Sequence, residues 1–254
     1  MTSGVARFSA GAWQGLRTRA LAERTLAEAL AAPDPAGGSR RRVRWVDAGG
    51  RRVVVKGFEA GLAGALVAVL RGSPARRGWR AGRALAALGI GAAAPLAYAE
   101  RRRMGLVVAS ALLLEDLAPA PAADAPAPGL GVEERLDALL RLALALHAAG
   151  ATHRDLMACN ILLVREGDVL AARLVDLEDV RLPRRLGDAA RLRALAQLNA
   201  SLPDWIGAPP RQRAFERYAS RLPFGCGSAR ALARIARLSA ARHHHWSGCR
   251  AGSM

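Results

Sequence analysis

The chain has 254 residues, a hydrophobic fraction of 52% and a formal net charge of +17. This length suffices for one large domain or one two-lobed unit, and the apolar content excludes an intrinsically disordered chain. Of the 38 basic residues all but Lys56 are arginine. The charge fits either compositional bias on solvated faces or attraction to nucleic acid, an acidic membrane surface or a phosphorylated substrate.

The cysteines and the apolar segments indicate in which cellular compartment the protein is expected. Cys159, Cys226 and Cys249 lie far apart and form no CxxC pair, which argues against a disulfide framework or a zinc site. Arginines interrupt the apolar stretches near the start, so we expect no signal peptide. The most apolar segment, residues 84–99, contains glycines and a proline and is too short to cross a bilayer. We therefore expect a soluble, cytoplasmic protein that at most contacts a membrane surface.

The first third of the chain is predicted to be rich in strands. Apolar spacing predicts a helix over residues 16–31, followed by a loop over residues 33–39. Two short strands are predicted at residues 42–46 and 52–56. The sequence Asp-Ala-Gly-Gly at residues 47–50 separates them and is a hairpin turn signal.

One helix and two further strands complete this predicted β-rich part. Ser73 followed by proline predicts a helix start, because serine caps helices and proline fits the first turn. The helix should end near Gly89, since glycine is favoured just after a helix C-terminus. Strands are predicted at residues 96–101 and 106–114.

The rest of the chain is predicted to be mainly helical. Residues 118–131 are dominated by Ala, Pro and Gly and predict a loop. A strongly apolar helix is predicted over residues 132–149, with Gly150 as its stop. A short hairpin follows, from Ile161 to a strand that ends at Asp176. From about Gly187 onwards the pattern is helical and basic.

The segment HRDLMACN, residues 153–160, carries the strongest chemical signal. It matches the pattern H-R-D-x-x-x-x-N of phosphoryl-transfer catalytic loops. Asp155 fits the carboxylate that orients the attacking hydroxyl and accepts its proton. Asn160 offers a neutral oxygen and Asp176 an anionic one, and Mg²⁺ prefers such hard ligands. The predicted hairpin should return Asp176 beside Asn160.

Lys56 fits a third role in the same chemistry, the cation on the nucleotide phosphates. It ends the apolar strand Val53-Val54-Val55, as the strand lysine of kinases does. A chain that otherwise uses arginine everywhere keeps lysine here, which indicates a site that needs a compact ammonium. Gly37, Gly38 and Ser39 are candidates for a phosphate-covering loop, although a plain linker is an equal alternative.

Three further features have weaker signals. Glu115 and Leu117 lie at the predicted junction of the two lobes and would meet adenine through backbone groups, an assignment that rests on position alone. His153 is predicted to be a packed structural histidine. The histidine run at residues 243–245 is predicted to be a solvated tail, because consecutive residues point in different directions.

The order of these elements predicts an α+β, two-lobed protein-kinase-like fold. The expected N-lobe comprises residues 1–116, with an N-terminal helix, a sheet that carries the strand lysine and one further helix. The expected C-lobe comprises residues 117–254, with the catalytic loop, the metal-binding hairpin and basic helices.

Several stretches together resemble the lipopolysaccharide core kinase family, also called the Kdo/heptose kinase family. The resemblance is carried by residues 150–163 and 174–179, with flanking similarity at residues 53–56, at 95–102 and around 191–202. It implies an ATP- and Mg²⁺-dependent kinase that phosphorylates a sugar hydroxyl of the lipopolysaccharide inner core at the cytoplasmic face of the inner membrane. It also implies Lys56 for ATP, Asp155 as base, and Asn160 and Asp176 for the metal.

The sequence departs from protein kinases in ways that leave alternatives open. No Asp or Glu occurs from Ala60 to Ala99, so the usual helix glutamate partner of Lys56 is missing, and Glu59 or Glu100 are the nearest candidates. A small-molecule kinase of the aminoglycoside or choline phosphotransferase type is one alternative. A non-catalytic basic pseudokinase module is the other. Nucleic acid is not the expected partner.

Overall fold

The computed structural model describes residues 4–32, 41–182 and 185–242. The contacts divide the chain into two units. The described residues up to Ala87, with Ala93–Asp116, form the first unit; Leu88–Ala92, with the chain from Leu117 onwards, forms the second. Within the described residues, no helix is both long and apolar enough to cross a membrane.

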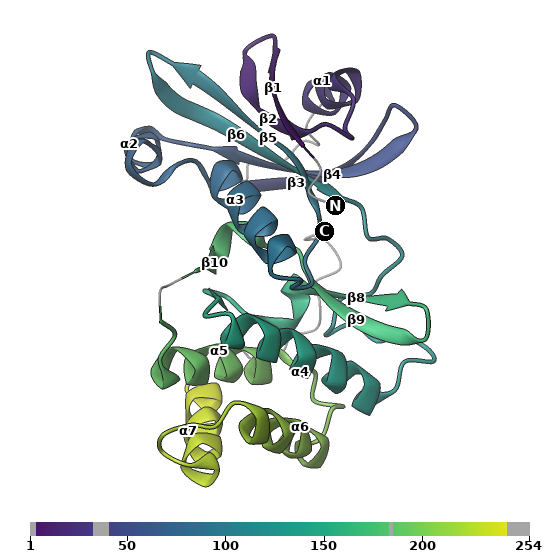
Figure 1. The fold of residues 1–254 in the computed structure, drawn as a ribbon, viewed down its shortest axis with the longest axis vertical. Helices are drawn as coiled ribbons and strands as arrows, with labels where there is room; N and C mark the ends of the chain where they lie inside the picture. Colours follow the sequence, from purple (N-terminus) through teal and green to yellow (C-terminus); the bar gives the residue numbers. More distant parts are fainter. Residues whose placement is uncertain (1–3, 33–40, 183–184, 243–254) are drawn as a thin grey trace. The chain divides into compact units, whose positions relative to one another are not determined.

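The first unit is built on one antiparallel sheet with the strand order β1-β2-β5-β6-β4-β3 (Figure 1). The strands are β1 (Val5–Ala10), β2 (Trp13–Thr18), β3 (Arg41–Ala48), β4 (Arg51–Glu59), β5 (Pro95–Arg103) and β6 (Leu106–Glu115). The predicted β3–β4 hairpin is confirmed, and Gly49 and Gly50 adopt the positive φ angles of 55° and 73° that its turn requires.

Two helices cover opposite faces of this sheet, and the strand alternation decides which side chains each helix meets. Helix α1 (Glu23–Ala31) packs its leucines against Val53 and Val55 of β4 in one core cluster. On the other face lies α3 (Pro74–Ala87), whose Trp79 ring lies 6.0 Å from that of Tyr98. Figure 1 shows α1 above these strands and α3 below them. Because successive side chains alternate, Lys56 belongs to the α3 face.

The predicted start and end of α3 are confirmed. The Ser73 hydroxyl accepts a hydrogen bond of 3.1 Å from the Arg76 amide, the contact of an N-cap. The same hydroxyl donates to the buried Glu100 carboxylate at 2.7 Å. Beyond the helix, Gly89 has a φ angle of 68°, which other residues rarely adopt. One serine therefore caps the helix and anchors it to strand β5.

Two sequence predictions were wrong in the first unit. The helix expected from residue 16 begins only at Glu23, because residues 13–18 form β2 instead. Gly15 reveals why: a Cβ there would lie 2.0 Å from the Tyr98 carbonyl oxygen, so the strand depends on close pairing with β5. The second error is a missed helix, α2 (Leu62–Arg71), so the unit has more than one helix after the strand lysine.

The second unit combines two short β-ladders with four helices. Its helices are α4 (Val132–Ala148), α5 (Asp188–Ser201), α6 (Ala208–Arg221) and α7 (Ser228–Ala240). Its ladders pair β8 (Ile161–Glu166) with β9 (Val169–Leu174) and β7 (Thr152–His153) with β10 (Val180–Arg181). Apolar residues of all four helices form one core cluster. The predicted α+β composition, with strands early and helices late, is confirmed.

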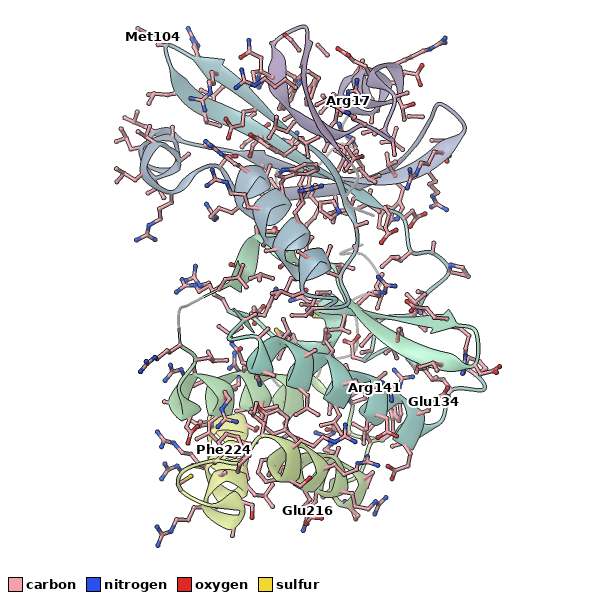
Figure 2. The ribbon with its side chains drawn as sticks, viewed as in Figure 1. Arg17, Met104, Glu134, Arg141, Glu216 and Phe224 are labelled. Atoms are coloured by element: carbon pink, nitrogen blue, oxygen red, sulfur yellow. The ribbon has the colours of Figure 1, made fainter. Side chains whose placement is uncertain are left out.

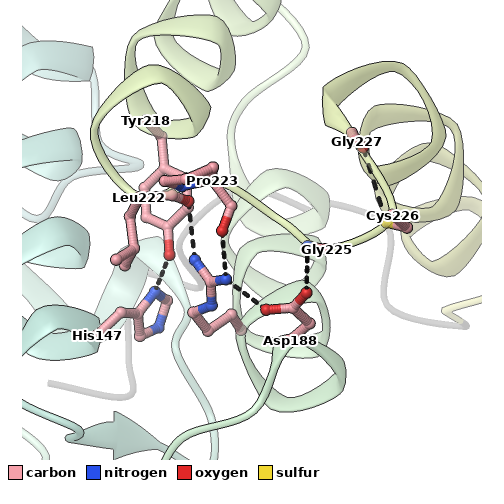
Figure 3. Close-up of polar contacts among 9 residues, drawn as sticks. His147, Asp188, Tyr218, Leu222, Pro223, Gly225, Cys226 and Gly227 are labelled. Carbon is pink, nitrogen blue, oxygen red and sulfur yellow. Dashed lines mark hydrogen bonds and ion pairs between the residues drawn. The ribbon is translucent and has the colours of Figure 1, made fainter.

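A buried polar cluster fastens α5 and α6 to α4 (Figure 3). The His147 ring nitrogen Nδ1 lies 2.8 Å from the Tyr218 hydroxyl. Arg191 donates to the Leu222 carbonyl at 2.8 Å and pairs with Asp188. Burial, with the nearby Arg191 charge as a smaller cause, lowers the pKa of His147 to about 4.

Residues 88–92 contact the β8–β9 hairpin of the second unit. The Leu174 amide donates to the Gly91 carbonyl at 3.2 Å, and Ala92 forms a β-bridge with Leu174. A Cβ on Gly91 would lie 2.4 Å from the Ala172 carbonyl oxygen, so only glycine allows this approach. The segment that follows α3 is thereby tied to the strand that leads to Asp176.

Candidate active site

The catalytic-loop sequence begins at β7. Its first residue, His153, forms hydrogen bonds to two backbone segments. His153 is buried, and its Nδ1 accepts the Asp155 backbone amide at 3.2 Å. Its Nε2 lies 2.6 Å from the Asp176 carbonyl oxygen, which can only accept, so Nε2 carries the proton. His153 is packed as predicted. Its ring links the backbone segments that carry the two candidate aspartates.

Asn160 closes the loop from its other end. Its side-chain Nδ2 donates to the Asp155 carbonyl at 3.0 Å, and its backbone amide donates to the Met157 carbonyl at 3.0 Å. The Met157 amide in turn donates to the Asp155 carbonyl at 2.9 Å. Because the NH₂ group of Asn160 faces the loop, its Oδ1 is directed elsewhere and is contacted by the weak Cys159 thiol at 3.9 Å. The side-chain amide of Asn160 is thus held in place, and its Oδ1 is the hard oxygen that it offers to a metal ion.

Asp176 lies two residues after the second strand of the β8–β9 hairpin, which ends at Leu174 and not at Asp176 as predicted. The Val175 amide donates to the Asn160 carbonyl at 3.1 Å, so the chain returns beside Asn160 as the sequence predicts. Asp176 itself is buried. The Arg154 amide also donates to the Asp179 carbonyl at 3.0 Å. The structure therefore brings the Asp155, Asn160 and Asp176 segments together within the second unit.

Two side chains of α5 position the same loop, and sequence reasoning missed both. Gln197 donates to the Arg154 carbonyl at 2.8 Å and accepts the Leu156 amide at 3.4 Å. The Ser201 hydroxyl accepts the Ala158 amide at 2.8 Å. Their spacing of four residues places them on one helix face, as it does for other polar pairs on a helix. These residues bracket Asp155 without touching reacting atoms.

Lys56 lies on β4 of the first unit and is buried. Of the two carboxylates considered as its partner, Glu59 pairs with Arg42 at 3.5 Å. Glu100 accepts hydrogen bonds from Ser73 at 2.7 Å and from Arg102 at 2.6 Å. Each glutamate thus has a cation or hydroxyl of its own. The role of Lys56 at a nucleotide stays a prediction.

The predicted nucleotide contacts are only partly described by the structure. The Glu115 amide donates to the Ala94 carbonyl at 3.0 Å, and its carboxylate accepts the Ala94 amide at 2.7 Å. The Leu117 carbonyl accepts the Ala120 amide at 3.0 Å. Their adenine contacts stay predictions. Gly37, Gly38 and Ser39 lie outside the described residues, as do His243, His244 and His245.

The donor set suits magnesium better than a metal held by protein alone. In the described ranges, no group of three or more His, Cys, Asp and Glu side chains could hold a metal ion. Asn160 and Asp176 offer one neutral and one anionic oxygen. Mg²⁺ usually takes one or two carboxylates and completes its shell with water and substrate phosphates. The residues present therefore fit a magnesium ion that arrives with a nucleotide.

The chain is similar to known proteins in sequence and in structure. The family model described as lipopolysaccharide kinase (Kdo/WaaP) family matches residues 38–216, which is well over half of the chain. No curated protein matches the sequence. A solved structure of WaaP in complex with acyl carrier protein shares 24% identity, covers 87% of this chain and 93% of that chain, and superposes with a TM-score of 0.63. This likeness confirms the predicted kinase-like fold.

A second solved structure is more distantly similar. The bifunctional kinase-methyltransferase WbdD shares 18% identity over 79% of this chain and 43% of that chain, with a TM-score of 0.45.

Proposed function

Because the chain belongs to the lipopolysaccharide kinase (Kdo/WaaP) family, we propose that it transfers the γ-phosphoryl group of ATP to a sugar hydroxyl of the lipopolysaccharide inner core. The family is one of kinases, so the chain is a phosphotransferase. The acceptor sugar, Kdo or heptose, and the use of ATP belong to the proposal. The observation that carries it is the hydrogen-bonded ring that joins Asp155, Asn160 and the segment before Asp176.

Asp155 is proposed to orient the acceptor hydroxyl and to take its proton. The hydroxyl oxygen then bonds to the γ-phosphorus while the bond to the β–γ bridging oxygen breaks, and ADP leaves with that electron pair. The backbone of Asp155 is held by His153, Asn160 and Met157, so the carboxylate needs little reorganisation.

Asn160 and Asp176 are proposed to hold Mg²⁺, which supplies positive charge to the phosphoryl oxygens when bound. Lys56 is proposed to bind the α- and β-phosphates of ATP. A compact ammonium with rotatable donors suits phosphate oxygens, and this explains why lysine occurs at position 56 alone in an arginine-rich chain.

The proposed site of action is the cytoplasmic face of the inner membrane, where a lipid-anchored core acceptor would be met. The net charge of +17 supports contact with anionic lipid and with phosphorylated glycolipid. The charge does not by itself favour nucleic acid, and the few aromatic side chains offer little stacking surface.

An acceptor panel tests this function. Purified protein is incubated with labelled ATP and Mg²⁺ and offered lipopolysaccharide core glycolipid, small aminoalcohols and a generic protein in parallel. We expect label in the core glycolipid alone. Label in the aminoalcohols would instead support the small-molecule kinase. Transfer to no acceptor, with salt-sensitive nucleic-acid binding, would support the pseudokinase module and contradict the proposal.

We also propose acyl carrier protein as a binding partner, because the second unit holds an apolar cavity. It has a volume of about 510 Å³ and is lined mainly by leucine and other apolar side chains of α4, α5, α6 and α7. An acyl chain needs such a lining. Mass spectrometry of acyl carrier protein retained on immobilised protein tests this; retention that is independent of the acyl chain would contradict a role for the cavity.

A further inference from the structure

Helix α2 presents its large side chains to solvent and only two alanines to the sheet. Every residue of this helix is exposed except Ala65 and Ala68. Its exposed large aliphatic residues are Leu62 (72%), Leu66 (54%), Val67 (48%), Val69 (63%) and Leu70 (87%). A surface helix of a globular protein ordinarily shows the reverse pattern. Folding of the first unit therefore does not account for the leucines and valines of α2.

The exposed aliphatic residues of α2 form one continuous stripe. At about 100° per residue, they fall within an arc of about 160°. Ala65 and Ala68 lie on the opposite side of the helix, where α2 packs against β6. The large aliphatic side of the helix is therefore directed away from its own unit, and two alanines face the sheet.

The β5–β6 hairpin extends this apolar surface. Met104 at its turn is 96% exposed, and Figure 2 shows its side chain at the far end of the hairpin. A groove between α2 and β6 is lined on the strand side by Val107 and Ala109, only a few residues further along. Met104 and α2 thus lie at the same end of the sheet. We call Met104 with the five exposed residues of α2 the α2 surface.

The surroundings of the α2 surface are basic. Arg71 at the end of the helix is exposed, as is Arg103 beside Met104 in the hairpin. No Asp or Glu occurs from Ala60 to Ala99. The carboxylate nearest in sequence, Glu59, is paired with Arg42 at 3.5 Å. A hydrophobic stripe with a basic border is complementary to a layer that is apolar inside and anionic at its surface.

We propose that the α2 surface docks the protein on a lipid bilayer that carries anionic headgroups. Its leucines and valines enter the boundary between headgroups and acyl chains, and its arginines meet lipid phosphates. A bilayer fits better than a protein partner because the large aliphatic side chains of α2 face solvent beside exposed arginines, which complements an apolar layer with an anionic surface. The choice of a membrane rests in part on the proposed function, since a lipid-anchored acceptor lies in one.

Vesicle binding of the full chain tests the proposal without any turnover. Wild-type protein is sedimented with vesicles of phosphatidylethanolamine and phosphatidylglycerol, and with vesicles of phosphatidylcholine alone. The test variant combines Leu66→Glu with Leu70→Glu. The matched control combines Val169→Glu with Leu182→Glu, which places the same charge on two exposed aliphatic residues of the second unit.

We expect strong binding to the anionic vesicles alone, and a loss of roughly tenfold or more in the test variant. The control should bind like the wild type, and both variants should keep the wild-type thermal midpoint. Equal losses in the two variants would overturn the proposal, because net charge alone would then explain binding. Loss of a dimer in the test variant, without vesicles, would assign the α2 surface to a second copy of the chain and overturn it too.

The result of the vesicle experiment can be told apart from a failure of the proposed kinase function. Phosphorylation of a delipidated core oligosaccharide should be equal in the test variant and in the wild type, because α2 carries none of the proposed catalytic residues. Vesicle binding that persists in a protein with no kinase activity would leave the docking surface standing and contradict only the reaction.

Discussion

The residues proposed for chemistry could be identified from sequence, whereas the residues that hold them could not. Asp155, Asn160 and Asp176 occur in a spaced pattern of residue types that is typical of phosphoryl-transfer sites. Gln197 and Ser201 act through contacts 41 to 43 residues away in the chain. Nothing local distinguishes them from other polar helix residues, because only the packing of α5 against the loop assigns them partners.

Gln197 provides the first prediction at this scale. Gln197→Ala removes one donor and one acceptor from the backbone on either side of Asp155. We expect kcat to fall by roughly tenfold or more with little change in the KM for ATP, since the loop loses its fixed position. Steady-state kinetics measure this.

The control is Gln212→Ala, because Gln212 is exposed on α6 and bonds only to Glu216 among its described contacts. Wild-type kcat in the Gln197 variant would contradict a positioning role. A fall in kcat that parallels a loss of folded protein would assign Gln197 to stability instead.

At the scale of elements, the sequence predicted those with strong end signals and missed those defined by tertiary contacts. Helix α3 has a serine cap and a terminal glycine, and both function as expected. The predicted helix over residues 16–31 took in the end of strand β2, because the pairing of β2 with β5 is invisible in its own residues. Helix α2 has no polar face, so periodicity gave no sign of an amphipathic surface helix.

Ser73 provides a prediction about element stability. Ser73→Ala removes the α3 cap, worth about 0.5–2 kcal/mol, and leaves the buried Glu100 carboxylate without one donor, worth about 1–3 kcal/mol. We expect the free energy of unfolding, measured in urea, to fall by about 2–4 kcal/mol in total. Ser73→Thr keeps the hydroxyl and should recover most of it. An effect no larger than that of Ser220→Ala, an exposed serine on α6, would refute this account.

The burial of His147 predicts that the stability of the second unit depends on pH. Its pKa is about 4 in the folded protein and near 6.5 when unfolded, so the unfolded state binds the extra proton. The contribution of His147 to stability is complete above pH 6.5 and declines as the pH falls towards 4. The decline amounts to about 3 kcal/mol. Unfolding measured from pH 7 to pH 4 should show this slope in the wild type; an identical slope in His147→Gln would contradict it.

At the scale of the whole molecule, composition and topology predicted the class of protein but not its surfaces. The strand-then-helix order and the catalytic loop sufficed for a kinase-like α+β fold, which the likeness to the WaaP structure confirms. The charge of +17 fitted either compositional bias or an anionic partner, and it located no surface for such a partner. Only the folded first unit shows where leucines and arginines gather, because the exposure of α2 depends on which of its faces the sheet covers.

The central claim is that Asp155 activates a sugar hydroxyl of the lipopolysaccharide inner core, and a matched pair of variants tests it most directly. Asp155→Asn and Asp168→Asn make the same change, the first in the catalytic loop and the second in the exposed β8–β9 turn. Mass spectrometry of purified core glycolipid after incubation with ATP and Mg²⁺ measures the gain of one phosphate. We expect Asp168→Asn to act like the wild type and Asp155→Asn to lose at least roughly 100-fold in rate. Undiminished phosphorylation of the glycolipid by the Asp155 variant would contradict the claim.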